Sequence, residues 1–177
     1  MGSLAPDFAL TSIEGKQVKL SDYKGKIVVL EWFNPGCPFV QKHYKNENMQ
    51  SLQSEFTGKG VVWLTINSTH PKHPNFMTPK KATAMVKEKG MKCTEMLMDP
   101  DGKVGKIYGA KTTPHMFIVN QQEKLVYQGA IDDTPSPWAD PKVAQNYVRM
   151  ALDEILVRKP VSIHETKPYG CSIKYED

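Results

Sequence analysis

The chain has 177 residues, of which 40% are hydrophobic and 24% are charged, so it can form one well-packed domain and is short for two. Its formal net charge of +4 comes from scattered lysines rather than from a basic cluster, which argues against a nucleic-acid-binding surface. No apolar stretch approaches the roughly 18 residues of a membrane span, and three cysteines are too few for a disulfide scaffold.

Apolar runs separated by turn residues predict an alternation of strands and helices. Nearly continuous apolar runs predict strands that are buried on both faces, as in a parallel sheet. Glycine and proline mark the helix ends and the loops between elements. In chain order, the predicted elements are a hairpin over 8–13 and 17–20, a strand over 26–33, a helix over 38–57, a strand over 61–67, a helix over 80–89, a strand over 95–98, a hairpin over 115–119 and 124–129, and a helix over 142–158.

This order predicts an α/β fold with one main domain. A right-handed βαβ start followed by a terminal hairpin gives a mixed β-sheet flanked by helices on both faces, with an N-terminal β-hairpin. We expect the domain to cover residues 4–159. Residues 160–177 contain two prolines and no helical period, so we expect them to form an extended tail over the domain.

The segment N-P-G-C-P-F-V (34–40) places Cys37 where a buried strand leads into a helix. Free N–H groups and the positive end of the helix dipole favour a thiolate at such a position. They lower a thiol pKa from about 8.5 into the range of about 3.5 to 7.5. The common alternative is a buried, inert cysteine, but Gly36 and Pro38 on either side argue against it. Val40 stands where a redox dithiol carries its second cysteine.

Several motifs together resemble a thioredoxin-fold redoxin. They are T-T-P (112–114) before the terminal hairpin, A-P-D-F-A-L (5–10), E-W-F-N-P-G-C-P-F-V-Q-K-H-Y (31–44) and G-C-S-I-K-Y (170–175). They resemble the alkyl hydroperoxide reductase/thiol-specific antioxidant group and, within it, bacterial peroxiredoxin-like proteins. The resemblance implies a thiol-based oxidoreductase or antioxidant role.

The resemblance also implies roles for residues around Cys37. Glu31 matches a buried acid that relays a proton during disulfide exchange. Pro114 matches a cis-proline beside the active cysteine, which leaves the Thr113 backbone free to pair with an extended substrate segment. We place His115 and Asn34 with them in the substrate-binding region.

Two histidines near the expected site, His43 and His115, are candidates for stabilising a Cys37 thiolate. A copper-carrying relative would have two cysteines at this loop, whereas this chain has only Cys37, so we expect no metal and no cofactor.

Peroxiredoxins carry a threonine or serine three positions before the active cysteine and a proline seven positions before it. Those positions hold Asn34 and Leu30 here, and neither Arg149 nor Arg158 matches the arginine that polarises the peroxide. We therefore expect disulfide exchange or slow peroxide reduction. The expected partners are a thiol reductant, a disulfide-bearing protein or a small peroxide. The alternative is a non-enzymatic binding module, either a metal carrier or a redox-inert interaction domain.

The partner predicted for Cys37 is Cys171. Cys93 precedes a predicted strand and is expected to be structural, whereas Gly170 lets the tail turn just before Cys171. Two alternatives stay open: Cys171 is buried beneath an edge strand, or an external thiol resolves Cys37. The sequence shows no leader, but an exported protein would look the same after processing, so periplasmic and cytoplasmic locations both stay open.

Overall fold

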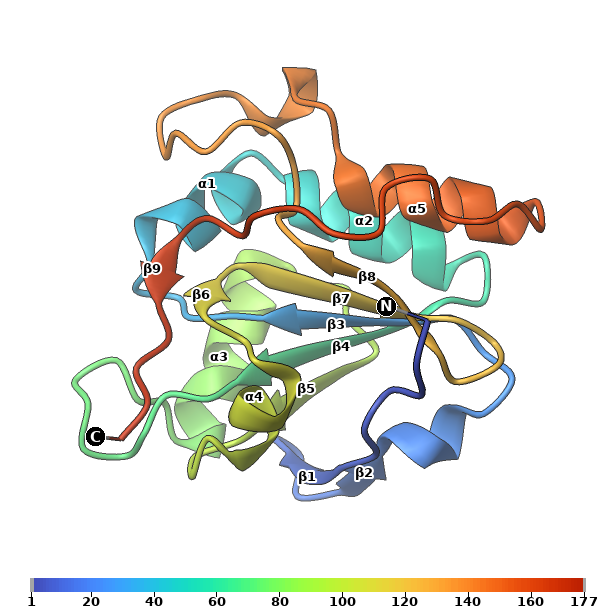
Figure 1. The fold of residues 1–177 in the computed structure, drawn as a ribbon. Coiled ribbons are helices and arrows are strands. Elements are labelled where there is room, and N and C mark those ends of the chain that lie inside the picture. Colours follow the sequence, from blue (N-terminus) through green and yellow to red (C-terminus); the bar gives the residue numbers. More distant parts are fainter. Residues whose placement is uncertain (1, 177) are drawn as a thin grey trace.

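The computed structural model describes residues 2–176, and a mixed β-sheet forms the centre of that part of the chain (Figure 1). Its seven strands lie in the order β2-β1-β5-β4-β3-β7-β8. Strands β3, β4 and β5 are parallel, whereas β1, β7 and β8 pair antiparallel with their neighbours. The sheet strands are β1 (Ala9–Ser12), β2 (Gln17–Lys19), β3 (Val28–Trp32), β4 (Val62–Asn67), β5 (Glu95–Met98), β7 (His115–Val119) and β8 (Leu125–Gly129).

Helices cover both faces of this sheet, as predicted. The helices are α1 (Pro38–Lys45), α2 (Asn48–Thr57), α3 (Pro79–Lys89), α4 (Lys103–Tyr108) and α5 (Tyr147–Leu156). Buried residues of α1, α2, α3 and α5 share one core with one face of the sheet, and α4 packs on the opposite face. The central strands β3 and β4 are buried along their whole length, which is why they read as continuous apolar runs.

The structure corrects two of the predicted helices and adds one that was not predicted. The helix expected over 38–57 is two helices, because Glu47 adopts a left-handed backbone conformation (φ 57°) between α1 and α2. The helix expected over 142–158 is shorter: a 3-10 turn at Pro141–Val143 precedes α5. Helix α4 was not predicted, because it has only six residues and contains a glycine.

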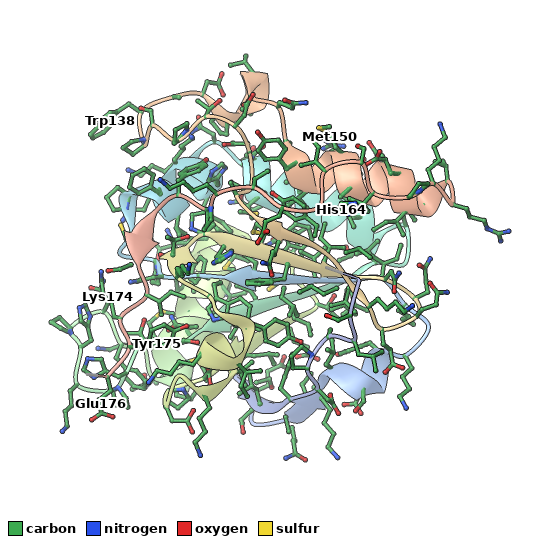
Figure 2. All side chains as sticks on the ribbon, viewed as in Figure 1. Trp138, Met150, His164, Lys174, Tyr175 and Glu176 are labelled. Carbon is green, nitrogen blue, oxygen red and sulfur yellow. The ribbon has the colours of Figure 1, made fainter. Side chains whose placement is uncertain are left out.

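The C-terminal segment is extended and crosses the domain (Figure 1). It ends in β9 (Cys171–Ser172), which pairs antiparallel with β6 (Thr112–Thr113) in a separate two-stranded sheet. Beyond β9, Lys174 and Tyr175 continue along the side of the domain (Figure 2). The Tyr175 hydroxyl donates a hydrogen bond to the Ala110 carbonyl at 2.8 Å. Among residues 2–176 there is no helix long and apolar enough to cross a membrane.

Candidate active site

A tight turn after β3 places Cys37 at the beginning of α1. The Cys37 N–H donates to the Asn34 carbonyl at 3.1 Å, and the Gly36 N–H donates to the Asn34 side chain at 3.0 Å. Cys37 is the N-cap residue of α1, and Pro38 occupies the first helical position. The side chain of Asn34, predicted as a substrate-binding residue, is therefore used within the turn itself.

The thiol of Cys37 lies against the loop that precedes β7. Its Sγ donates to the Thr113 carbonyl at 3.2 Å. The Thr113–Pro114 peptide bond is cis, as predicted. Cys37 is only 2% exposed, because the C-terminal segment lies beside it.

Strand β9 brings Cys171 to the same place. Cys171 is directly opposite Thr113 in the β6–β9 pair, and the Thr113 carbonyl accepts from the Cys37 thiol, so both cysteines lie beside the same residue. All three cysteines are reduced in this structure. The structure thus brings together Cys37, Cys171, Thr113 and Pro114, four of the residues selected from the sequence.

The surroundings of Cys37 favour its thiolate over that of Cys171. Burial by itself raises the pKa of Cys37, but hydrogen bonds from the Cys171 thiol, from Thr113 and from the backbone N–H of Val40 hold that pKa below its ordinary value. The Thr113 hydroxyl is buried and has no hydrogen-bond partner among the described residues, so it is available to donate to a Cys37 thiolate. Burial and the adjacent Cys37 raise the pKa of Cys171 to about 11.

Glu31 is completely buried, and four side-chain donors surround its carboxylate. The donors are the Tyr44 hydroxyl at 2.6 Å, the Trp63 indole at 2.8 Å, and Thr65 and Gln53 at 3.1 Å each. Burial raises the pKa of Glu31 despite these bonds. Cys37 is not one of the four donors; Tyr44, two turns further along α1, links Glu31 to the helix that Cys37 begins. Its proton-relay role stays a prediction.

The two candidate histidines lie apart from the Cys37 thiol. His115 lies on the opposite face of the sheet, where its ring stacks on Phe117 at 4.5 Å and accepts a hydrogen bond from the Lys111 N–H. Burial lowers the pKa of His115 to about 4. His43 is fully buried and hydrogen-bonds Tyr169 and Asn48. The structure therefore brings neither ring to the sulfur.

Cys93 is separate from this pair. It packs against the main core, near Thr65 and Glu31, and burial raises its pKa to about 12. This environment agrees with the structural role expected for it.

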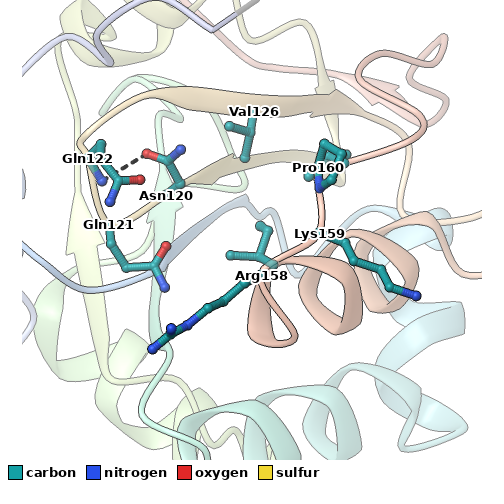
Figure 3. Close-up of a pocket in the computed structure, with 9 residues that line it drawn as sticks. Asn120, Gln121, Gln122, Val126, Arg158, Lys159 and Pro160 are labelled. Carbon is teal, nitrogen blue, oxygen red and sulfur yellow. Dashed lines mark hydrogen bonds between the residues drawn. The ribbon is translucent and has the colours of Figure 1, made fainter.

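A pocket of about 540 Å³ lies at the other end of the sheet (Figure 3). Asn120 follows the end of β7 that is remote from His115, and Arg158 follows α5. In β3, Trp32 pairs with His115 and Val28 pairs with Val119, so Cys37 and this pocket lie at opposite ends of the central strands. The pocket therefore belongs to a different surface. Within residues 2–176 no cluster of three or more histidine, cysteine or acidic residues could hold a metal ion.

The sequence did not point to Lys42, Asp132 and Tyr169 as parts of the site. Lys42 and Asp132 are almost fully buried, and together with His43 they contact the Tyr169 hydroxyl beside Cys171. A tyrosine two positions before Cys171 was the only local signal, because its partners are 37 to 127 residues away in the chain.

The sheet order, the cysteine at the start of α1 and the cis-proline opposite it define a thioredoxin-fold protein with a candidate thiol site. The thioredoxin domain of a thiol-disulfide oxidoreductase from Bacteroides vulgatus has the same fold: the TM-score is 0.57 at 22% identity, over 72% of this chain and 86% of that one.

Residues 1–128 match the AhpC/TSA family, and the chain belongs to that family. It is similar to the thiol-disulfide oxidoreductase ResA of Bacillus thuringiensis, with 28% identity over 130 residues, 72% of this chain and 68% of that protein. An uncharacterized conserved protein from Geobacillus kaustophilus matches 99% of this chain and 92% of its own, with a TM-score of 0.88 and 33% identity. This chain is therefore a thiol-based oxidoreductase of the redoxin family, and the match to the Geobacillus protein extends over the C-terminal segment.

Proposed function

We propose that this protein carries out thiol–disulfide exchange, with Cys37 as the nucleophile and Cys171 as the resolving cysteine. The observation that carries the proposal is that both cysteines meet at Thr113: its carbonyl accepts from the Cys37 thiol at 3.2 Å, and its backbone pairs with Cys171 in the β6–β9 pair. The unequal pKa directions assign the roles: Cys37, with the lowered pKa, attacks first, and Cys171, with the raised pKa, attacks second.

The exchange proceeds in two steps that conserve electrons. The Cys37 thiolate attacks one sulfur of a substrate disulfide, forms a mixed disulfide and releases the other substrate sulfur as a thiolate. Cys171 loses its proton and attacks Cys37 Sγ, which releases the second substrate thiolate and leaves a Cys37–Cys171 disulfide. The substrate disulfide is reduced by two electrons and the protein dithiol is oxidised by two. An external thiol reductant then restores the dithiol.

The buried position of Cys37 requires movement of the C-terminal segment during this cycle. At 2% exposure the sulfur is not open to a protein disulfide. Separation of β9 from β6 exposes both Cys37 and the backbone of Thr113, which then offers an extended substrate segment a strand partner. Re-pairing of β9 returns Cys171 to the mixed disulfide.

Peroxide reduction is less well supported than disulfide exchange. Arg149 forms an ion pair with Glu55 at 2.8 Å, and Arg158 lines the pocket at the other end of the sheet. Neither arginine is placed to polarise a peroxide beside Cys37.

Insulin reduction by dithiothreitol, with single cysteine variants, tests the proposal. Cys37→Ser should lose turnover, Cys171→Ser should accumulate a mixed disulfide and turn over slowly, and Cys93→Ser is the matched control that should keep the wild-type rate. Wild-type turnover by Cys37→Ser would overturn the proposal. Copper(I) binding by the reduced wild type without insulin or peroxide turnover would favour the metal-carrier alternative instead.

A further inference from the structure

A buried polar cluster fixes the C-terminal segment two residues before Cys171. The Tyr169 hydroxyl donates to Asp132 Oδ1 at 2.5 Å and lies 3.2 Å from His43 Nε2 and 3.4 Å from Lys42 Nζ. Lys42, His43 and Asp132 are between 0% and 3% exposed. Such a set of buried polar groups is stabilising only when its members are paired with one another.

The hydrogen-bond pattern around Tyr169 assigns a proton to each contact. Asn48 donates its amide to His43 Nδ1 at 2.9 Å, so the histidine proton resides on Nε2. Burial lowers the pKa of His43 to about 3, which keeps the ring neutral. The Tyr169 oxygen therefore accepts from His43 and Lys42 while its own proton goes to Asp132. All the hydrogen-bonding capacity of this hydroxyl is used.

The same cluster connects the tail to the helix that Cys37 begins. Lys42 and His43 belong to α1, and the ring of Phe39, also in α1, meets the Tyr169 ring edge-on at 5.8 Å. Gly170, the one residue between Tyr169 and Cys171, lies directly against the Thr113 carbonyl. Little freedom therefore remains between the anchored ring and the Cys171 sulfur.

We propose that Tyr169 is a positioning residue for the second step of disulfide exchange: its hydroxyl, anchored by Lys42, His43 and Asp132, sets Cys171 against Cys37. This inference rests on the proposed function, because it assigns a role within the pairing of Cys37 and Cys171. The hydroxyl affects the attack of Cys171 on the mixed disulfide and not the initial attack by Cys37, since its partners hold the tail and do not contact the Cys37 sulfur.

A two-phase reaction with Ellman's reagent, in a Cys93→Ser background, separates these steps. Attack by Cys37 releases one coloured thiolate and leaves a mixed disulfide, and attack by Cys171 on that mixed disulfide releases a second. Tyr169→Phe keeps the ring against Phe39 but removes the hydroxyl. We expect its first phase to be unchanged or faster and its second phase to be about tenfold slower, as loss of hydrogen bonds to charged groups predicts.

Two further variants distinguish positioning from general loss of stability. Tyr108→Phe is the matched control, because the hydroxyl that it removes donates to the Pro6 carbonyl and is not part of the cluster around Tyr169. It should form the Cys37–Cys171 disulfide at the wild-type rate. Asp132→Asn keeps an acceptor for Tyr169, so its second phase should be nearly as fast as that of wild type. The second phase of Asp132→Ala should be as slow as that of Tyr169→Phe. Asp132 Oδ2 accepts no hydrogen bond among the described residues, so an amide nitrogen in its place breaks none.

The outcomes separate this inference from the proposed function. If the Cys93→Ser protein without any other substitution released no second thiolate, the pairing of Cys37 with Cys171 would be wrong. If the second phase occurred in wild type and was equally fast in Tyr169→Phe, the pairing would stand and the positioning role of Tyr169 would be overturned. Equal slowing by Tyr108→Phe would also overturn it.

Discussion

Replacing Gly170 by alanine should separate β9 from β6 and prevent efficient formation of the Cys37–Cys171 disulfide. Gly170 has φ 143°, a backbone conformation that favours glycine. A Cβ atom at this position would lie 2.8 Å from the carbonyl carbon of Thr113 and closer still to its oxygen. Both neighbouring atoms belong to the backbone, so they cannot rotate away as a flexible side chain would.

The size of the effect follows from this geometry. A strained backbone conformation costs about 1–3 kcal/mol, and each 1.4 kcal/mol is a factor of ten in an equilibrium constant. Strand β9 pairs only with β6, outside the main sheet. Most of the strain energy should therefore appear as detachment of β9 rather than as global unfolding. We expect the equilibrium constant for disulfide formation to fall about tenfold or more, and the free energy of unfolding to fall by no more than about 3 kcal/mol.

Equilibration with glutathione redox buffers, acid quenching and mass spectrometry measures that constant directly. Gly25→Ala is the matched control, because Gly25 has φ 82° with no atom within 4 Å of an added Cβ, and it precedes the end of β3 that is remote from Cys37. Gly25→Ala should retain the wild-type equilibrium constant. A wild-type constant in Gly170→Ala would refute the argument that β6–β9 pairing holds Cys171 in place.

Three further predictions concern the ionisable groups. The alkylation rate of Cys37 should become half-maximal at a lower pH than the rates of Cys171, whose pKa is raised to about 11, and Cys93, whose pKa is raised to about 12. Mass spectrometry of each cysteine peptide checks this order. Equal alkylation rates for Cys37 and Cys93 at neutral pH would contradict it. Thr113→Val removes a buried hydroxyl donor and should slow alkylation of Cys37 at pH 7 by about tenfold, with a smaller effect at pH 10; an unchanged pH profile would exclude the hydroxyl as a donor. Glu31→Gln tests the buried acid in two ways. Because burial raises the pKa of Glu31, the folded state binds the proton more tightly than the unfolded state. The stability of wild type relative to Glu31→Gln should therefore fall as the pH rises from the ordinary pKa of glutamate through the raised one. Urea unfolding at several pH values measures this difference, and a pH-independent difference would contradict a raised pKa. Loss of insulin turnover in Glu31→Gln would support the proton relay, and full turnover would exclude it.

Local sequence patterns predicted the sheet strands and the position of Cys37 at a helix start, because both depend on near neighbours. The apolar runs of β3 and β4 follow from burial on both faces, and the position of Cys37 follows from a strand that leads into a proline-initiated helix. The break between α1 and α2 was missed because Glu47 adopts its left-handed conformation without a glycine or proline to mark it.

The remaining features depend on contacts between distant parts of the chain. Alternation along β7 places His115 on the face opposite Met116, but the sequence does not say which face α1 covers. The anchoring of Tyr169 depends on Lys42 and Asp132, which meet only after α1, the loop after β8 and the tail have packed together.

The identity of the disulfide formed on oxidation decides whether Cys171 is the partner of Cys37. Reduced wild-type protein is treated with one equivalent of diamide, blocked with an alkylating agent, digested without reductant and mapped by mass spectrometry. We expect a Cys37–Cys171 peptide as the dominant disulfide, with Cys93 alkylated only after unfolding. A disulfide that includes Cys93, or monomeric protein in which Cys37 is oxidised while Cys171 stays free, would contradict it.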